Sequence, residues 1–163
     1  MAGVAPARVG ALLRDLRAVV GSDVALVAND GFADFAGLVA AAGPAAQGLY
    51  VGNYGLPNRE LPRAGRRFLR EFEAARGGEW TPDFSAAYAA QAAEILLDAI
   101  ARSDGTRKSV TRELFRTRIE SGILGEVRFD ENGDLVEAPV TIFRIVGKRA
   151  VVDRVVTASL AVP

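Results

Sequence analysis

The chain has 163 residues, half of them hydrophobic, and its 20 basic side chains are balanced by 20 acidic ones. This length is enough for one domain or for parts of two lobes, and the hydrophobic content excludes wholesale disorder. Because balanced charge provides no global field to hold a polyanion, we expect no binding to nucleic acid.

Two residue types are absent, since the sequence contains no cysteine and no histidine. Their absence excludes disulfides, thiol nucleophiles, imidazole metal ligands and a Ser–His–Asp triad. Lys108 and Lys148 are the only lysines, which makes a catalytic lysine a poor candidate. We therefore predict a chain that is not an enzyme, with no catalytic residues, no metal site and no cofactor.

Hydropathy gives no indication of membrane insertion. No run approaches the ~18 apolar residues that a membrane-spanning helix needs. Residues 1–16 include Arg8 and Arg14 and lack an apolar stretch of signal-peptide length. On its own, the chain is expected to remain in the cytoplasm.

The first half of the chain has the pattern of alternating helices and strands. Residues 6–20 predict an amphipathic helix, with Pro6 in its first turn and Gly21 after its end. Residues 23–28 form an apolar run typical of a parallel strand covered on both faces. A helix over 32–42 and a strand over 48–53 then complete a β-α-β unit.

The second half changes character twice. Three helical stretches follow without strands between them, at residues 63–76, 83–102 and 109–118. Residues 140–146 and 150–156 then predict a β-hairpin that turns at Gly147. The turn-rich residues 130–134 resemble a calcium loop but fail the test for one, because Gly133 occupies its fourth position and Thr141 stands where the bidentate Glu belongs.

Three stretches together resemble one protein family. They are residues 23–53, with the connection Gly43-Pro44-Ala45-Ala46-Gln47-Gly48, the helical pair at 65–105, and the closing hairpin at 122–148, which begins GILGEVRFDENGD. In this order, over residues 6–148, they resemble the C-terminal portion of type I periplasmic solute-binding proteins of the branched-chain amino acid receptor family.

The resemblance implies an α/β fold of two three-layer lobes joined by hinge crossings. Residues 1–52 and 126–157 would belong to lobe 2, and residues 53–125 to the hinge connector and the helical part of lobe 1. Other segments of both lobes have no counterpart, which would leave open sheet edges of the kind that proteins normally cover. We therefore expect either part of a larger protein or a homodimer that completes the sheet.

The implied function is non-catalytic binding of an amino acid-like ligand. The partner would be an ABC permease, and the parent receptor would act outside the cytoplasm. An alternative is a cytoplasmic ligand-sensing or oligomerisation module of a regulatory protein with the same fold. A third alternative, a flavodoxin-like enzyme, lacks a recognisable glycine-rich or carboxylate-centred site.

Candidate ligand-binding residues follow the first predicted strand, because open α/β sheets bind ligands at the carboxyl ends of strands. They are Asn29, Asp30, Gly31 and Phe32. In the resembling receptors an acidic residue in this loop pairs with the ligand's ammonium group, and Asp30 matches it. The alternative is that Asp30 caps the following helix, and both roles can coexist.

Further candidates lie near the hinge and the long helix. Tyr54 stands in a glycine-rich loop, where it can face the cleft or serve the structure. By resemblance, Asp83, Phe84 or Tyr88 would contact the ligand at the start of the long helix. Phe84 and Tyr88 share a helix face, so packing in the core is the alternative.

Overall fold

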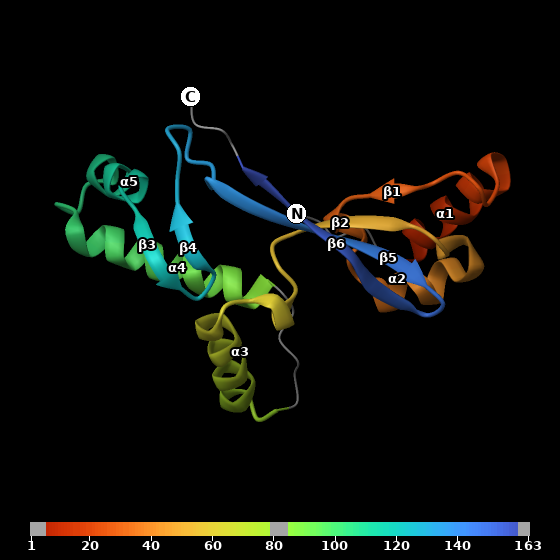
Figure 1. Ribbon diagram of the computed structural model, residues 1–163, viewed down its shortest axis with the longest axis horizontal. Helices are drawn as coiled ribbons and strands as arrows, with labels where there is room; N and C mark the ends of the chain where they lie inside the picture. The colour runs from red at the N-terminus through yellow and green to blue at the C-terminus, as the bar shows by residue number, and fades with distance from the viewer. Residues whose placement is uncertain (1–5, 79–84, 160–163) are drawn as a thin grey trace. The chain divides into compact units, whose positions relative to one another are not determined.

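The computed structural model describes residues 6–78 and 85–159. The chain divides into two compact units (Figure 1). The first consists of residues 1–55 and 139–156, and the second of residues 56–138 and 157–163. The sequence-based division instead lay at residues 52 and 125, and the assignment of these units to lobes stays a prediction.

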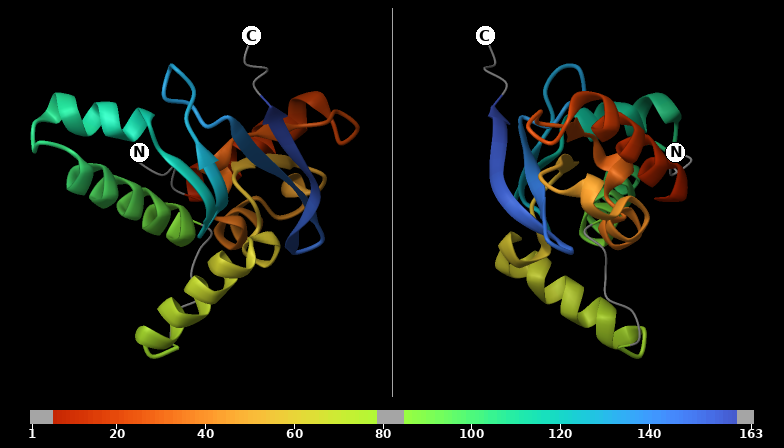
Figure 2. Two further views of the ribbon diagram at one scale, coloured as in Figure 1. Left: turned by 60° about the vertical axis from the view of Figure 1, so that its left-hand side comes forward. Right: turned by 90° about the vertical axis from the view of Figure 1, so that its right-hand side faces the viewer.

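The first unit is built on a mixed sheet of order β1-β2-β5-β6, in which β1 runs parallel to β2 and β2 antiparallel to β5. Its helices α1 and α2 lie on one side of these strands (Figure 2). The bounds are α1 Pro6–Val20, β1 Val27–Ala28, α2 Phe35–Ala42, β2 Tyr50–Tyr54, β5 Glu137–Val146 and β6 Arg149–Ser159, with short 3₁₀ helices at Asp30–Phe32 and Gly43–Ala46.

The core of this unit joins both helices to the two central strands. Leu38 of α2 and Val51 of β2 are both almost completely buried. Around them pack Val9, Leu13, Ala42, Ala46, Leu49 and Ile145. Phe35 and Phe143 extend this packing, with ring centroids 4.9 Å apart. The sheet face under α2 is therefore apolar up to Val51.

The predicted strand over residues 23–28 is wrong in its extent. Only Val27 and Ala28 pair with β2, opposite Tyr50 and Val51. Within the described residues β1 lies at the edge of the sheet, so that β2 is the one strand beside it. The segment before Val27 therefore has a possible strand partner on one side at most. Val27 is 76% exposed, which contradicts the expected burial on both faces.

The second predicted helix also begins later than expected. The structure has a 3₁₀ turn over Asp30–Phe32, and α2 starts at Phe35. Asp34 is the reason, because its carboxylate accepts a hydrogen bond from the Gly37 N–H at 3.0 Å and caps the helix there.

The second unit contains the helices α3 to α5 and a two-stranded antiparallel sheet of β3 and β4. The bounds are α3 Arg63–Ala75, α4 Ser85–Arg102, α5 Arg107–Phe115, β3 Arg118–Gly122 and β4 Gly125–Arg128, with a 3₁₀ turn at Asn58–Glu60. Leu61, Leu69, Ala87 and Ile123 form its core. No helix among the described residues is both long and apolar enough to cross a membrane.

The helix predicted over residues 109–118 is wrong at both ends. α5 begins two residues earlier, where Thr106 caps it by accepting from the Ser109 N–H. It ends at Phe115, and Arg118 already pairs with Arg128 in the small sheet. Strand β3 was not predicted.

Candidate functional site

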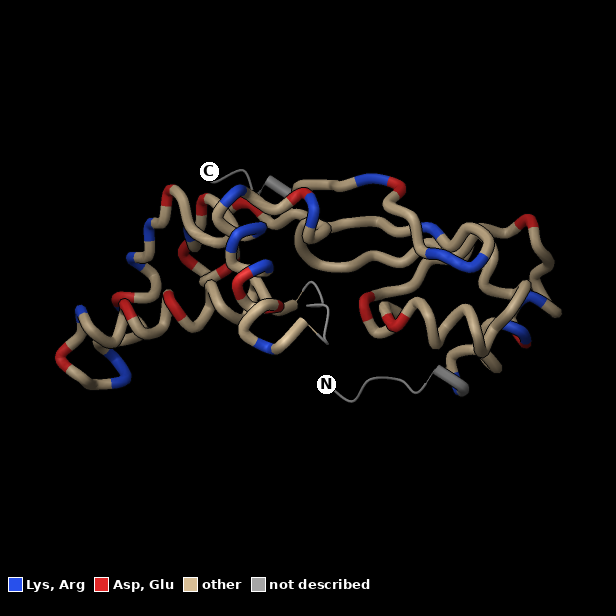
Figure 3. Tube along the Cα trace, turned by 90° about the horizontal axis from the view of Figure 1, so that it is seen from below, with Lys and Arg blue, Asp and Glu red and all other residues tan. Residues whose placement is uncertain are grey.

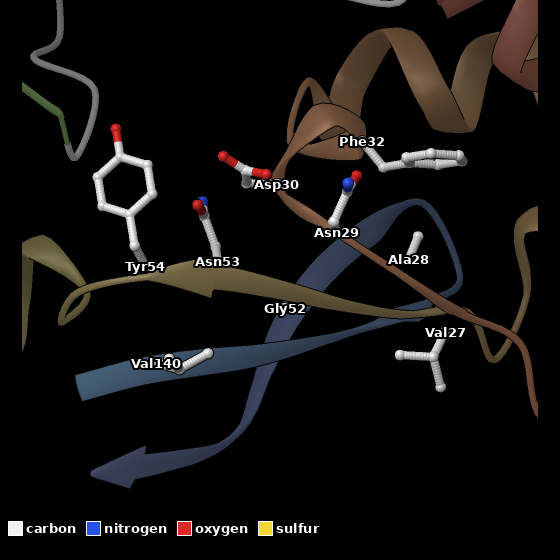
Figure 4. Close-up of a pocket in the computed structure, with 9 residues that line it drawn as sticks. All are labelled: Val27, Ala28, Asn29, Asp30, Phe32, Gly52, Asn53, Tyr54 and Val140. Atoms are coloured by element: carbon white, nitrogen blue, oxygen red, sulfur yellow. The ribbon is translucent and has the colours of Figure 1, made fainter. Parts of the chain in front are cut away.

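The ends of the two parallel strands β1 and β2 form an open pocket of about 760 Å³ in the first unit. Since Ala28 lies opposite Val51 in the register, the residues that follow them, Asn29–Asp30 and Gly52–Asn53, lie at the same end of the sheet. The lining residues are Val27, Ala28, Asn29, Asp30, Phe32, Gly52, Asn53, Tyr54 and Val140 (Figure 4). The pocket thus lies where ligands of α/β sheets bind.

Four of the predicted site residues line this pocket, namely Asn29, Asp30, Phe32 and Tyr54. Gly31 belongs to the same loop but is not among the lining residues. Asp83 and Phe84 lie outside the described residues. Whether any of these residues contacts a ligand stays a prediction.

The interpretation of Asp30 as a helix cap is wrong. Asn29 caps the 3₁₀ turn, because its side-chain oxygen accepts from the Gly31 N–H at 3.2 Å, and Asp34 caps α2. The half-buried Asp30 carboxylate has no hydrogen-bond or ion-pair partner in the part of the chain that the structure describes. It is also the one charged group among the lining residues.

Asn53 is a lining residue that the sequence reasoning did not select. It lies on β2, two residues after Val51 and on the same face, and it is only 2% exposed. Neither its side-chain oxygen nor its side-chain nitrogen has a partner among the described residues. Figure 4 shows its amide directed to the same side of the strands as Asn29 and Asp30. The one signal in the sequence is a polar residue at the end of an otherwise apolar strand.

The remaining walls are apolar and partly exposed. Val27, Ala28 and Val140 contribute small aliphatic groups. Phe32 belongs to both the pocket and the packing around the core. Tyr54 is 45% exposed at the end of β2. The pocket therefore combines one carboxylate and one buried amide with an aliphatic and aromatic surface.

The turn at residues 130–134 is explained without a metal. The Asp130 carboxylate accepts from the N–H groups of Asn132 and Asp134, both at 2.9 Å. The Asp134 N–H in particular holds the pKa of Asp130 below its ordinary value. Across the described residues, no group of three acidic side chains is placed to hold a metal ion. The prediction of a turn here is confirmed.

Comparison with known proteins identifies the family. The model of the family described as "Periplasmic binding protein" matches residues 1–150. The chain belongs to this family of binding proteins, and the α/β fold expected from the sequence is confirmed. None of the curated proteins matches the chain.

Solved structures place the fold among receptors of branched-chain amino acid transporters. A leucine-binding protein from Thermotoga maritima is 25% identical with a TM-score of 0.72, over 93% of this chain and 42% of that one. A substrate-binding protein from Desulfitobacterium hafniense in complex with Leu is 25% identical with a TM-score of 0.63, over 88% of this chain and 39% of that one. A solute-binding protein from R. palustris in complex with benzoate is 18% identical with a TM-score of 0.63, over 94% of this chain and 42% of that one. At this identity the likeness is one of fold alone.

The chain therefore spans about two fifths of the length of the solved structures that it resembles. The resemblance seen in the sequence is confirmed as that of a part of such a receptor.

Proposed function

We propose that this chain provides one ligand-binding surface of a solute-binding receptor for an amino acid-like ligand. The observation that carries the proposal is the unpaired carboxylate of Asp30, located in a pocket at the carboxyl ends of two parallel strands. Asp30 would accept hydrogen bonds from the ammonium group of the ligand. The chain would perform no catalysis.

The chemistry of the pocket supports an amphiphilic ligand. A half-buried carboxylate without a partner favours a cation, and a charge-assisted hydrogen bond to an ammonium group is stronger than a neutral one. The aliphatic groups of Val27, Ala28 and Val140 offer contact to an apolar side chain. An α-amino acid with a branched aliphatic side chain has both features.

The relatives support the same ligand class. The Thermotoga maritima protein binds leucine and the Desulfitobacterium hafniense protein was solved with Leu. Receptors of this kind close two lobes on the ligand, and such a receptor would deliver it to an ABC permease outside the cytoplasm. Because this chain spans two fifths of those proteins, we expect the isolated chain to bind weakly.

Replacing Asp30 by asparagine is the direct test. We expect the wild-type chain to bind L-leucine with a dissociation constant of about 1 mM or weaker, seen as amide shifts in Asn29–Phe32 and Tyr50–Tyr54 during an NMR titration. Asp30→Asn should weaken binding about tenfold, because it removes one charge-assisted hydrogen bond.

Asp23→Asn is the matched control, since Asp23 is exposed and does not line the pocket. It should leave leucine binding unchanged. Benzoate has no ammonium group and should not shift the Asp30 loop. Equal leucine binding by Asp30→Asn and the wild type would contradict the role of Asp30. Binding of leucine by the wild-type chain with a micromolar or lower dissociation constant would contradict an incomplete site.

A second candidate is self-association as an oligomerisation or sensory module, as the alternative interpretation of the sequence suggested. The observation that favours it is the edge strand β1, where Val27 is 76% exposed, together with Val24 just before the strand, which is 47% exposed. Figure 3 shows basic and acidic residues interspersed along the chain, in which 20 basic side chains balance 20 acidic ones. Bare apolar edges favour pairing between chains.

The molar mass in solution tests this proposal. We expect light scattering to give a dimer that Val27→Lys converts to a monomer, because a lysine on an edge strand opposes pairing. Leu97→Lys should leave the dimer intact, since Leu97 is exposed on α4 in the other unit. A wild-type chain that is monomeric at high concentration would contradict self-association through β1.

A further inference from the structure

The buried amide of Asn53 is unusual for its place in the fold. It is 2% exposed, and neither its nitrogen nor its oxygen has a partner among the described residues. Its cross-strand neighbour Thr141 is already engaged, because the Thr141 hydroxyl donates to the carbonyl of Gly55 at 2.6 Å. A buried polar group without a partner loses its hydration and gains nothing in return.

Packing alone gives no reason for an amide at this position. The preceding residue on this face of β2 is Val51, which is fully buried in the core. Leucine branches at the same carbon atom as asparagine, although it is larger, and would continue that apolar surface without an unpaired donor or acceptor. We expect an unpaired amide here to destabilise the unit in its ligand-free form, and buried unpaired groups of this kind call for an explanation beyond stability.

Asn53 and Asp30 lie at the same end of the sheet. Ala28 lies opposite Val51, and Asp30 and Asn53 each follow two residues later along parallel chains. Both side chains line the same pocket and are directed to the same side of the strands (Figure 4). A ligand group bound by Asp30 therefore lies within the region that the Asn53 amide faces.

We infer that Asn53 is a further ligand-binding residue, which recognises a carbonyl group adjacent to the ligand's ammonium group. This inference rests on the proposed function of Asp30. The amide nitrogen of Asn53 donates to the ligand's carbonyl or carboxylate oxygen, while its oxygen can accept from the ammonium.

Because the Asn53 side chain is uncharged, it determines which groups beside the ammonium the pocket can recognise. Because none of the described lining residues carries a positive charge, the ligand's carboxylate is met by a neutral donor rather than by an ion pair. The pocket therefore accepts an amino acid amide about as well as the free amino acid. A primary amine that lacks the carbonyl group loses the contact with Asn53.

The experiment compares the wild-type chain with Asn53→Leu in two measurements. Without ligand, Asn53→Leu should raise the midpoint of thermal unfolding by about 4 °C, because an unpaired buried amide is removed. In NMR titrations it should weaken L-leucine and L-leucinamide about tenfold each and leave 3-methylbutylamine unchanged. Asn132→Leu, which changes an exposed amide in the other unit, should leave all three affinities unchanged.

The outcomes separate the two proposals. A lower unfolding midpoint for Asn53→Leu would show that the amide has a structural role and would overturn the inference. Equal weakening of all three ligands, or of none, would also overturn it, even if Asp30→Asn weakens leucine as expected. If leucine does not bind the wild-type chain at all, the proposed function fails and this inference fails with it.

Discussion

Replacing Leu38 by alanine is expected to lower the free energy of unfolding of the first unit by about 3 kcal/mol. Leu38 is 1% exposed and belongs to the core cluster that connects α1, α2 and the two central strands. Truncation removes buried methyl groups and leaves a cavity that packed neighbours fill only in part. Urea unfolding followed by circular dichroism, together with amide exchange of Val51 and Ile145, measures the loss.

Leu12→Ala is the matched control, because Leu12 lies on α1 of the same unit and is 50% exposed. It should cost about 1 kcal/mol or less, since half of that side chain already contacts water. Loss of the same size from both variants would contradict a core centred on Leu38. Loss of the Asp30 loop signals in Leu38→Ala is expected as well, because α2 directly follows that loop.

Local signals predicted α1 with its observed bounds. Pro6 opens the helix and Gly21, with a φ of 81°, follows its last residue. The same pattern did not predict how much of the helix is buried. Val9 and Leu13 are in the core, whereas Leu16 and Val19 of the same helix are 38% and 85% exposed. Periodicity identifies an apolar stripe, but the neighbouring elements decide how much of it they cover.

Strand extent was harder to predict because it depends on the partner. Residues 23–28 read as a buried strand, yet β1 is limited to Val27 and Ala28 at the edge of the sheet. Strand β3 was missed because Arg118 was assigned to a helix, and only its pairing with Arg128 defines it as a strand. Both differences reflect long-range pairing, which a short window of sequence does not contain.

The candidate site was predicted in part for the same reason. The loop Asn29–Phe32 follows from the rule that ligands bind at the carboxyl ends of parallel strands. Asn53 was not selected, because its significance lies in being buried without a partner, and that depends on the packing of distant residues. The cap assignment of Asp30 was wrong because Asn29 and Asp34 perform the two capping roles.

Gly10→Ala is expected to destabilise the first unit by about 2 kcal/mol, although alanine is normally the better helix former. Gly10 is buried on α1, and a Cβ atom there would lie 2.6 Å from the carbonyl carbon of Ala41 on α2. Because that neighbour is backbone, α1 and α2 would have to separate. Overpacking of this kind costs up to about 3 kcal/mol, and the helix propensity of alanine offsets about 1 kcal/mol of it.

The sign of this change distinguishes close helix packing from intrinsic helix propensity. Ala18→Gly, at an exposed position of the same helix, should also destabilise the unit, by up to about 1 kcal/mol, because there propensity acts alone. Glycine is thus favoured over alanine at position 10 and disfavoured at position 18, as urea unfolding of both variants would measure. If Gly10→Ala instead stabilised the unit, α1 and α2 would not approach each other at Gly10 and Ala41 as closely as the structure shows.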